Sequence, residues 1–198
     1  MKILDMCCGS KMFWYEKYEP HTTYMDIRKD VYTTMDHGKE RKIEIAPDIK
    51  ADFTDIPFAD NTFDLVVFDP PHLIHAGKNS WLAKKYGVLD PITGIAEVIE
   101  GFKEGIRVLK PTGTLLFKWN QDQIPFGEIL RNLKNEGFTP ILGDKRSKTK
   151  WTVFIKPVET AEETAEVVVE TAEKTAEVVL EAAESAVAAE EAVEKAEA

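Results

Sequence analysis

The sequence DFTDIPFADNTFDLVVFDPPH occupies residues 52–72. Its segment Phe63–Phe68 is an apolar run interrupted only by Asp64, which is typical of a strand buried on both faces of a parallel sheet. The Asp-Pro-Pro triplet at 69–71 ends this strand, because proline has no N–H to donate to a sheet ladder. The stretch therefore predicts a central strand with polar residues at its carboxyl end.

Strand and helix patterns alternate along the first 157 residues, as in α/β proteins. The apolar positions of Gly94–Leu109 recur at helical spacing, and Gly137 marks the end of a second helix at Phe126–Asn135. The alternation predicts an α/β, Rossmann-like, doubly wound sheet that is mostly parallel, has an antiparallel last strand and is covered on both faces. The other strands are expected at Ile3–Met6, Thr23–Ile27, Asp48–Asp52, Thr114–Trp119, Thr139–Leu142 and Trp151–Lys156.

The composition changes after Pro157, where aromatic residues disappear and Ala, Glu, Val and Thr dominate. The chain has 25 Lys and Arg against 35 Asp and Glu, but thirteen of the Glu lie from Glu159 onward with only two Lys, so residues 1–158 are close to neutral. Eleven-residue repeats begin at Thr160 and Thr171, which corresponds to roughly 3.67 residues per helical turn. We expect a domain at 1–157 and an acidic tail at 158–198 that is helical or partly disordered. Such a tail is either a solvated helix without a chemical role, or a helix through which the protein associates with itself or with a protein partner.

Cysteine usage and hydropathy limit the class of protein. Cys7 and Cys8 are adjacent and form no ordinary disulfide, and four scattered His complete no zinc pattern, so we expect no metal site. No apolar run approaches the roughly 18 residues that span a bilayer. An acid at position 5 is unlike the apolar core of a secretion signal. We expect a cytoplasmic protein without a membrane partner.

The turn after the first strand suits a nucleoside. Ligands of open α/β sheets bind outside the carboxyl ends of the strands. The small residues of Cys7–Ser10 let the backbone approach a ligand, and Asp26 follows at the distance of an acid that holds two ribose hydroxyls. Because the turn has a single glycine, Gly9, it serves a pyrophosphate poorly, and a nucleoside without phosphates fits better.

Taken in order, these segments resemble the class I S-adenosylmethionine-dependent methyltransferases over residues 1 to about 156. Leu4–Ser10 resembles the family's first motif, whose acid and turn hold the methionine part of the cofactor. Residues 52–67 are similar to its third and fourth motifs, and Arg107–Gly113 resembles the turn before its fifth strand. The resemblance implies S-adenosylmethionine as cofactor, with Asp26 on the ribose and Asp52 on the adenine amino group. The cofactor-binding residues implied in this way are Asp5, Met6, Cys7, Cys8, Gly9, Asp26, Ile27, Asp52, Phe53 and Asp69.

Asp69-Pro70-Pro71-His72 resembles the Asp/Asn-Pro-Pro-aromatic motif of amino-methyltransferases that act on adenine N6, cytosine N4 or an amide nitrogen. An exocyclic amine on a ring is a poor nucleophile, because its lone pair is delocalised. An acceptor side chain and a proline carbonyl that bind its hydrogens favour a pyramidal nitrogen, so positioning supplies most of the catalysis. His72 would stack on the extruded base or act as a proton acceptor. We expect all four residues to be catalytic.

The connection Leu73–Asp90 is long enough to be a lid or a binding element. Trp81 and Tyr86 lie in it among lysines, which suits stacked bases and phosphates, although the same rings would also pin the loop to the body. Lys118 follows the fifth strand, and together with Asp69 it also resembles ribose 2′-hydroxyl methyltransferases. That interpretation ranks lower, because such enzymes need another lysine ahead of the first motif. We expect Trp81, Tyr86 and Lys118 to bind substrate.

The sequence thus predicts a methyltransferase that moves a methyl group from S-adenosylmethionine to an exocyclic amino group of a nucleobase in DNA or RNA. Basic clusters at 39–42 and 145–150 are further candidates for phosphate contacts. Two alternatives stay open. The acceptor is a small molecule or a protein side chain, or the domain is a non-catalytic cofactor-binding module that assembles through its tail.

Overall fold

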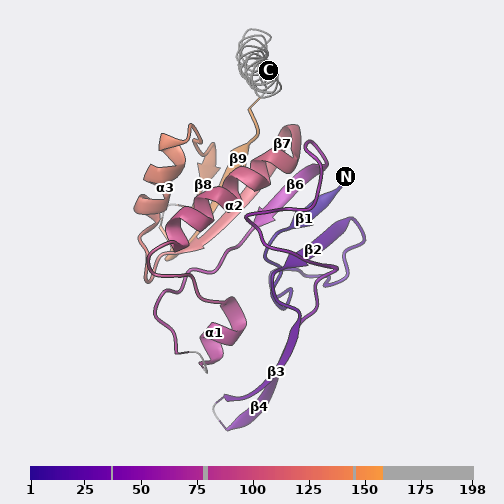
Figure 1. The fold of residues 1–198 in the computed structure, drawn as a ribbon, viewed down its shortest axis with the longest axis vertical. Helices are drawn as coiled ribbons and strands as arrows, with labels where there is room; N and C mark the ends of the chain where they lie inside the picture. Colours follow the sequence, from indigo (N-terminus) through magenta and orange to yellow (C-terminus); the bar gives the residue numbers. More distant parts are fainter. Residues whose placement is uncertain (37, 78–79, 145, 158–198) are drawn as a thin grey trace, which may run out of the picture. The chain divides into compact units, whose positions relative to one another are not determined.

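A seven-stranded sheet forms the centre of the computed structural model, which describes residues 1–36, 38–77, 80–144 and 146–157 (Figure 1). The strand order is β5-β2-β1-β6-β7-β9-β8; β9 is antiparallel to its neighbours β7 and β8, and the other strand pairs are parallel. This confirms the expected mostly parallel sheet with an antiparallel last strand. The predictions for the tail at 158–198 lie outside the described residues. The strands are β1 (Ile3–Asp5), β2 (Thr22–Asp26), β5 (Ile49–Lys50), β6 (Phe63–Phe68), β7 (Leu109–Asn120), β8 (Leu142–Gly143) and β9 (Thr149–Ile155).

The strand β6 has the bounds that its apolar run predicts, and it lies between β1 and β7. Val66 pairs with Leu4 of β1 and Leu115 of β7, and all three side chains are fully buried. The strand expected at Thr139–Leu142 was placed too early, because the ladder with β9 begins only at Leu142. Pro140 has no N–H for such a ladder, so pairing starts beyond it.

Two helices cover one face of the sheet (Figure 1). They are α2 (Gly94–Val108) and α3 (Phe126–Asn135), which agree with the predicted helices to within one residue. Their buried side chains, such as Phe102 and Leu133, belong to one core cluster with β6 and β7. No helix among the described residues is long and apolar enough to cross a membrane.

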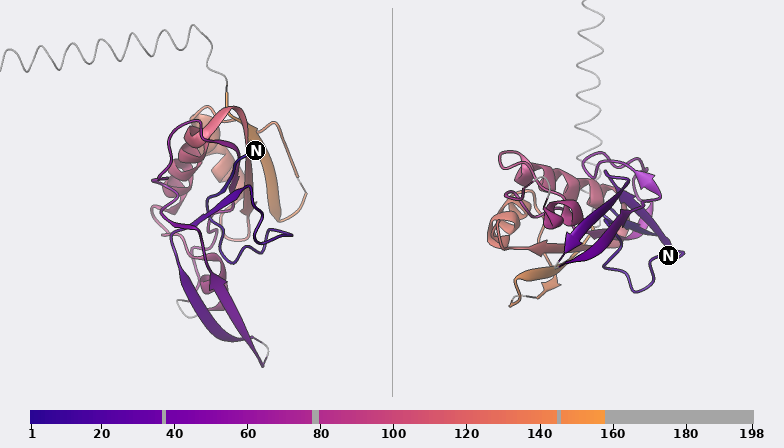
Figure 2. Two further views of the ribbon diagram at one scale, coloured as in Figure 1. Left: turned by 90° about the vertical axis from the view of Figure 1, so that its right-hand side faces the viewer. Right: turned by 90° about the horizontal axis from the view of Figure 1, so that it is seen from below.

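The opposite face carries the connection between β1 and β2, which is a loop (Figure 2). Phe13 stacks on Trp151 of β9 at 4.8 Å between ring centroids, and Trp14 meets Tyr24 of β2 edge-on at 5.4 Å. A doubly wound sheet usually carries helices on both faces. Here aromatic side chains of a loop provide the cover at this end of the second face.

A hairpin and a short helix lie beyond the carboxyl ends of the parallel strands (Figure 1). The hairpin, β3 (Asp30–Asp36) and β4 (Lys39–Ile45), forms its own two-stranded sheet between β2 and β5 in sequence. The helix α1 (Trp81–Tyr86) begins at the cap Ser80, whose hydroxyl accepts from the Ala83 N–H at 3.0 Å. Neither element was expected from the sequence.

The helix α2 lies very close to the residues after β5. A Cβ on Gly101 would be 2.3 Å from Cδ2 of Phe53 and 3.0 Å from Cζ of Phe68. Any side chain at position 101 would clash with the Phe53 ring, so Phe53 can pack against α2 only because this residue is glycine. The position of this ring is therefore set by the helix behind it.

We expect Gly101→Ala to lower the free energy of unfolding by about 1–3 kcal/mol, because the added methyl group displaces Phe53 and overpacks the core. Alanine gains about 1 kcal/mol in helix propensity, which offsets part of this loss. Urea unfolding measures the difference. Gly127→Ala in α3 is the matched control, since its Cβ would meet nothing within 4 Å. Equal stability of the two variants would contradict the close packing of α2.

Candidate active site

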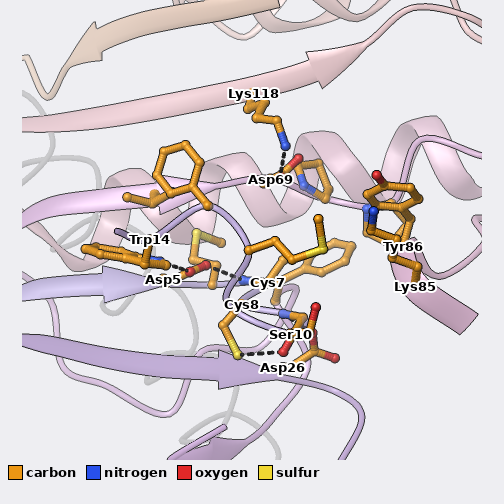
Figure 3. A pocket seen from close by; sticks show the side chains of 18 of the residues that line it. Asp5, Cys7, Cys8, Ser10, Trp14, Asp26, Asp69, Lys85, Tyr86 and Lys118 are labelled. Carbon is orange, nitrogen blue, oxygen red and sulfur yellow. Dashed lines mark hydrogen bonds and ion pairs between the residues drawn. The ribbon is translucent and has the colours of Figure 1, made fainter. Parts of the chain in front are cut away.

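A cavity of about 880 Å³ opens at the carboxyl ends of β1, β2, β6 and β7 (Figure 3). Cavities of roughly 300–1,000 Å³ are typical of small-molecule sites. Polar residues from these strands meet here because parallel strands end at the same edge, and the strand order reverses between β1 and β6. We call this space the central cavity.

Most of the residues expected from the sequence line the central cavity. Three lie elsewhere: Asp52, His72 and Trp81. Asp52 accepts from the N–H and hydroxyl of Thr54, at 2.9 and 2.8 Å. The expected residues that line the cavity are Asp5, Met6, Cys7, Cys8, Gly9, Asp26, Ile27, Phe53, Asp69, Pro70, Pro71, Tyr86 and Lys118.

Two smaller hollows hold His72 and Trp81. His72 lines a hollow of about 340 Å³, the His72 hollow, which shares Asp69, Tyr86 and Lys118 with the central cavity. Trp81 lines another hollow of about 600 Å³. The catalytic and substrate-binding residues expected from the sequence therefore surround three adjoining spaces rather than one.

The turn after β1 presents backbone to the central cavity. Gly9 has φ +49°, a left-handed conformation that favours glycine, and its N–H donates to Oδ2 of Asp26 at 2.9 Å. The Cys8 N–H donates to the Met25 carbonyl at 2.9 Å. These two bonds attach backbone N–H groups of the turn to β2 and so fix the position of this wall of the cavity.

Asp5 is a buried carboxyl group at the end of β1. It accepts from Nε1 of Trp14 at 2.7 Å and from the Cys7 N–H at 3.2 Å (Figure 3). Burial raises the pKa of Asp5 to about 7, although both hydrogen bonds oppose this shift. Sequence reasoning missed Trp14, since nothing in its spacing sets it apart from other loop aromatics.

Asp26 is held by Arg28, a residue that sequence reasoning also missed. Its carboxylate accepts from the Gly9 N–H and from three nitrogens of Arg28: N at 2.9, Nε at 3.0 and Nη2 at 3.3 Å. A carboxylate has about four acceptor positions, so Asp26 has a full set of donors. Arg28 also donates to the Lys84 carbonyl of α1 at 3.1 Å. It therefore ties the end of β2 to α1.

Asp69 and Lys118 form an ion pair at the boundary between the central cavity and the His72 hollow (Figure 3). Nζ of Lys118 donates to Oδ2 of Asp69 and lies 5.5 Å from the centre of the Trp151 ring. Burial raises the pKa of Asp69, and the Lys118 ammonium opposes this shift. Lys118 thus occupies one of the two oxygens of this carboxylate.

His72 and Tyr86 form an aromatic pair beside this ion pair. Their ring centroids are 5.3 Å apart, with the planes tilted by 53°. Burial lowers the pKa of His72 below its usual range, which favours the neutral ring. A neutral imidazole next to a tyrosine ring offers two weakly polar ring faces, which are inclined to each other.

Comparison with solved structures identifies the architecture. A SAM-dependent methyltransferase from Methanosarcina mazei matches with a TM-score of 0.50 at 14% identity, covering 80% of this chain and 93% of that one. This chain has the methyltransferase fold. N-methyltransferase NodS from Bradyrhizobium japonicum, in complex with S-adenosylhomocysteine, matches with a TM-score of 0.48 at 17% identity, covering 79% and 78%. The 1,6-didemethyltoxoflavin-N1-methyltransferase from Burkholderia thailandensis gives 0.46 at 11%, covering 79% and 71%.

No protein-family model matches the sequence, and no curated protein matches it either. At these identities the similarity to solved structures concerns the fold. The residues of the candidate site are therefore interpreted from their own geometry and chemistry.

The raised pKa of Asp5 predicts a specific pH dependence. Folded Asp5 binds a proton more tightly than the unfolded residue does, whose pKa is 3.8. Its contribution to stability is therefore complete below that pH and is lost as the pH rises through about 7. Asp5→Asn keeps an acceptor for Trp14 but removes the charge. We expect the variant to gain up to about 4 kcal/mol relative to wild type between pH 4 and pH 8.

Urea unfolding at several pH values checks this expectation. Asp55→Asn, at an exposed position, is the control and should retain the pH profile of the wild type. A profile of Asp5→Asn parallel to that of wild type would show that folding does not raise the pKa of Asp5.

Proposed function

We propose that this protein is a methyltransferase that moves a methyl group from S-adenosylmethionine to an exocyclic amino group of a nucleobase in DNA or RNA. The observation that carries the proposal is the position of Asp69. It lines both the central cavity and the His72 hollow, so one carboxylate faces two adjoining spaces. Methyl transfer needs a donor and an acceptor that meet at one point, and the Asp-Pro-Pro segment stands at that point.

The central cavity suits the cofactor. Asp5 and the turn at Cys7–Gly9 offer a carboxyl group and exposed backbone for the methionine part. Phe53, whose ring lies between α2 and the cavity, offers a flat apolar surface for adenine. S-adenosylmethionine supplies an electrophilic methyl group on a positively charged sulfur. Asp5, Asp26 and Asp69 line the cavity and are available to this charge, while Arg28, Lys85 and Lys118 line it as well.

Ribose binding by Asp26 requires a change of partners. Its carboxylate has a full set of donors, two of them from the Arg28 guanidinium. Ribose hydroxyls would replace these two, while the Gly9 N–H and the Arg28 backbone N–H stay in place. Asp52 would likewise exchange Thr54 for the adenine amino group.

The acceptor amine would lie where the His72 hollow meets the central cavity, because Asp69 lines both spaces and Pro70 lines the central cavity. Oδ1 of Asp69 and the Pro70 carbonyl accept its two hydrogens, which directs the nitrogen lone pair toward the methyl group. The nitrogen–carbon bond forms as the carbon–sulfur bond breaks, the electron pair leaves with sulfur, and the nitrogen then releases one proton to solvent. His72 and Tyr86 provide the surface on which the extruded base stacks.

Asp69→Ala tests the central claim. We expect turnover to fall by about 10²- to 10³-fold, because the amine loses an oriented acceptor. Asp69→Asn is the matched variant, since its amide oxygen still accepts a hydrogen bond, and it should retain much more activity than alanine. Transfer of a labelled methyl group to DNA, RNA and a metabolite extract, followed by mass spectrometry of the nucleosides, measures the effect.

Two results would count against the proposal. Label that enters only the metabolite extract would make the acceptor a small molecule. Full activity of Asp69→Ala on nucleic acid would remove Asp69 from the reaction. Calorimetry with S-adenosylhomocysteine serves as the control for cofactor binding in each variant.

His72 has two interpretations that substitution separates. If it stacks on the base, His72→Phe keeps activity, whereas His72→Ala loses about 5- to 100-fold, since stacking contributes about 1–3 kcal/mol per base. If it accepts a proton, both variants lose activity equally and the pH–rate profile loses a step. We expect the first outcome, because burial lowers the pKa of His72 although the charge of Asp69 opposes this shift, and a lower pKa makes the ring a weaker proton acceptor. Rates of methyl transfer across pH 5 to 9 decide.

A further inference from the structure

A basic groove adjoins the central cavity on the side of the hairpin. It is the hollow of about 600 Å³ between the loop after β1, the hairpin strand β4 and α1. Among the described residues that line it, four are cationic and Glu44 is the one acidic residue. These cations come from three separate segments of the chain: Lys17 from the loop, Arg41 and Lys42 from β4, and Lys85 from α1.

The charge of this groove is a local feature. Residues 1–158 are close to neutral overall, so four cations against one carboxylate is a concentration that the average composition does not explain. Lys42 pairs with Glu44 at 2.9 Å, but both side chains are more than half exposed. Ion pairs as exposed as this one are weak in water, so an anionic ligand competes with Glu44 for Lys42 at little cost.

The helix α1 connects the groove to the candidate acceptor site. Trp81 lines the groove, Lys85 lines both the groove and the central cavity, and Tyr86 lines both the central cavity and the His72 hollow. Nζ of Lys85 lies 6.0 Å from the centre of the Trp81 ring and 4.9 Å from that of Tyr86. One short helix thus carries an aromatic ring, a cation and a second ring along a continuous path.

We propose that the basic groove binds the phosphodiester backbone of single-stranded nucleic acid and leads the strand to the His72 hollow. This inference rests on the proposed function and names the surface that would deliver its substrate. Phosphates bind Lys17, Arg41, Lys42 and Lys85, and a base next to the target stacks on Trp81, because positively charged grooves with aromatic rings are how proteins hold single strands. Lys85 is followed along α1 by Tyr86, which lines the His72 hollow, so a phosphate at Lys85 directs the following nucleotide toward that hollow and Asp69.

The shape of the surface favours a strand over other anionic partners. An anionic lipid surface calls for cations on an open face, whereas these cations line a hollow that continues into a cavity. A small uncharged acceptor would need no cations along its path. The hairpin has its own two-stranded sheet outside the main one, and its strand β4 contributes two of the four cations.

The test compares binding of fluorescent single-stranded DNA and RNA oligonucleotides by anisotropy at several salt concentrations. Lys17→Gln/Arg41→Gln removes two groove cations without touching the central cavity. We expect about tenfold weaker binding at low salt, and a slope of log affinity against log salt that is shallower by about 0.7 for each cation removed. Arg131→Gln/Lys134→Gln on α3 makes the same charge change at exposed positions of another element and should bind like wild type.

Trp81→Ala provides a second, independent variant. It should weaken binding by about 5- to 100-fold through loss of stacking while leaving the salt slope unchanged. Calorimetry with S-adenosylhomocysteine is expected to give wild-type affinity for the Lys17→Gln/Arg41→Gln variant, which shows that its fold and central cavity are intact. The DNA and RNA arms of the binding experiment distinguish the two kinds of strand.

Three outcomes would overturn the groove: no binding of single strands by wild type, binding of anionic vesicles instead, or equal losses in the groove and control variants. Methyl transfer separates this inference from the proposed function. If the groove variant loses strand binding but wild type methylates no nucleic acid, the groove stands and the proposed function fails. If wild type and the groove variant methylate strands equally well, the groove fails and the proposed function stands.

Discussion

Three carboxyl groups at the ends of parallel strands converge on one cavity, and the site is built around the need to stabilise them. Burial penalises each charged form, and the charges of Asp26 and Asp69 add to the raised pKa of Asp5. Each group finds a different solution. Asp5 has a pKa near neutrality and a Trp14 donor, Asp26 binds the guanidinium of Arg28, and Asp69 binds Lys118. Under the proposed function, the sulfonium of the cofactor would bring a further positive charge to these three carboxyl groups.

The Arg28 guanidinium links the hydrogen bonding of Asp26 to the helix α1. It binds both the Asp26 carboxylate and the Lys84 carbonyl, while the Cβ position of Gly87, at the end of α1, lies 3.1 Å from Cγ of Pro71. The helix is thus tied by a hydrogen bond to Arg28 of the candidate ribose site, and its capping residue Gly87 lies close to Pro71 of the Asp-Pro-Pro segment. Under the proposed function, ribose hydroxyls that displace Arg28 from Asp26 also change what holds α1. Cofactor and strand then act on one helix.

The parts of the fold that the sequence predicted are those in which burial leaves a periodic pattern. The apolar run of β6 and the helical spacing of α2 and α3 reflect one core, so their bounds follow from the pattern of apolar residues. The hairpin β3–β4 lies outside that core, and its charged strand Lys39–Ile45 shows little apolar alternation. In the site, strand-end position together with the resemblance to methyltransferase motifs indicated the three carboxylates. Trp14 and Arg28 escaped notice, because a hydrogen-bond partner leaves no trace in spacing. Asp52 belongs to a motif but accepts hydrogen bonds from its near neighbour Thr54, and the order of the motifs does not reveal this local partner.

The pairing of Asp69 with Lys118 also bears on the kind of acceptor. A hydroxyl acceptor must lose its proton before or during attack, so its enzyme needs a base near the oxygen. Nζ of Lys118 donates to Asp69 and is engaged there as a hydrogen-bond donor. Among the described residues, the other lysine that lines the central cavity is Lys85. An amine keeps a lone pair while both its hydrogens are bound, and it releases a proton only after the bond to carbon has formed. An amine acceptor therefore needs two oriented hydrogen-bond acceptors from the protein and no base. The carboxylate oxygen of Asp69 and the rigid prolines behind it match that requirement better than they match the activation of a hydroxyl.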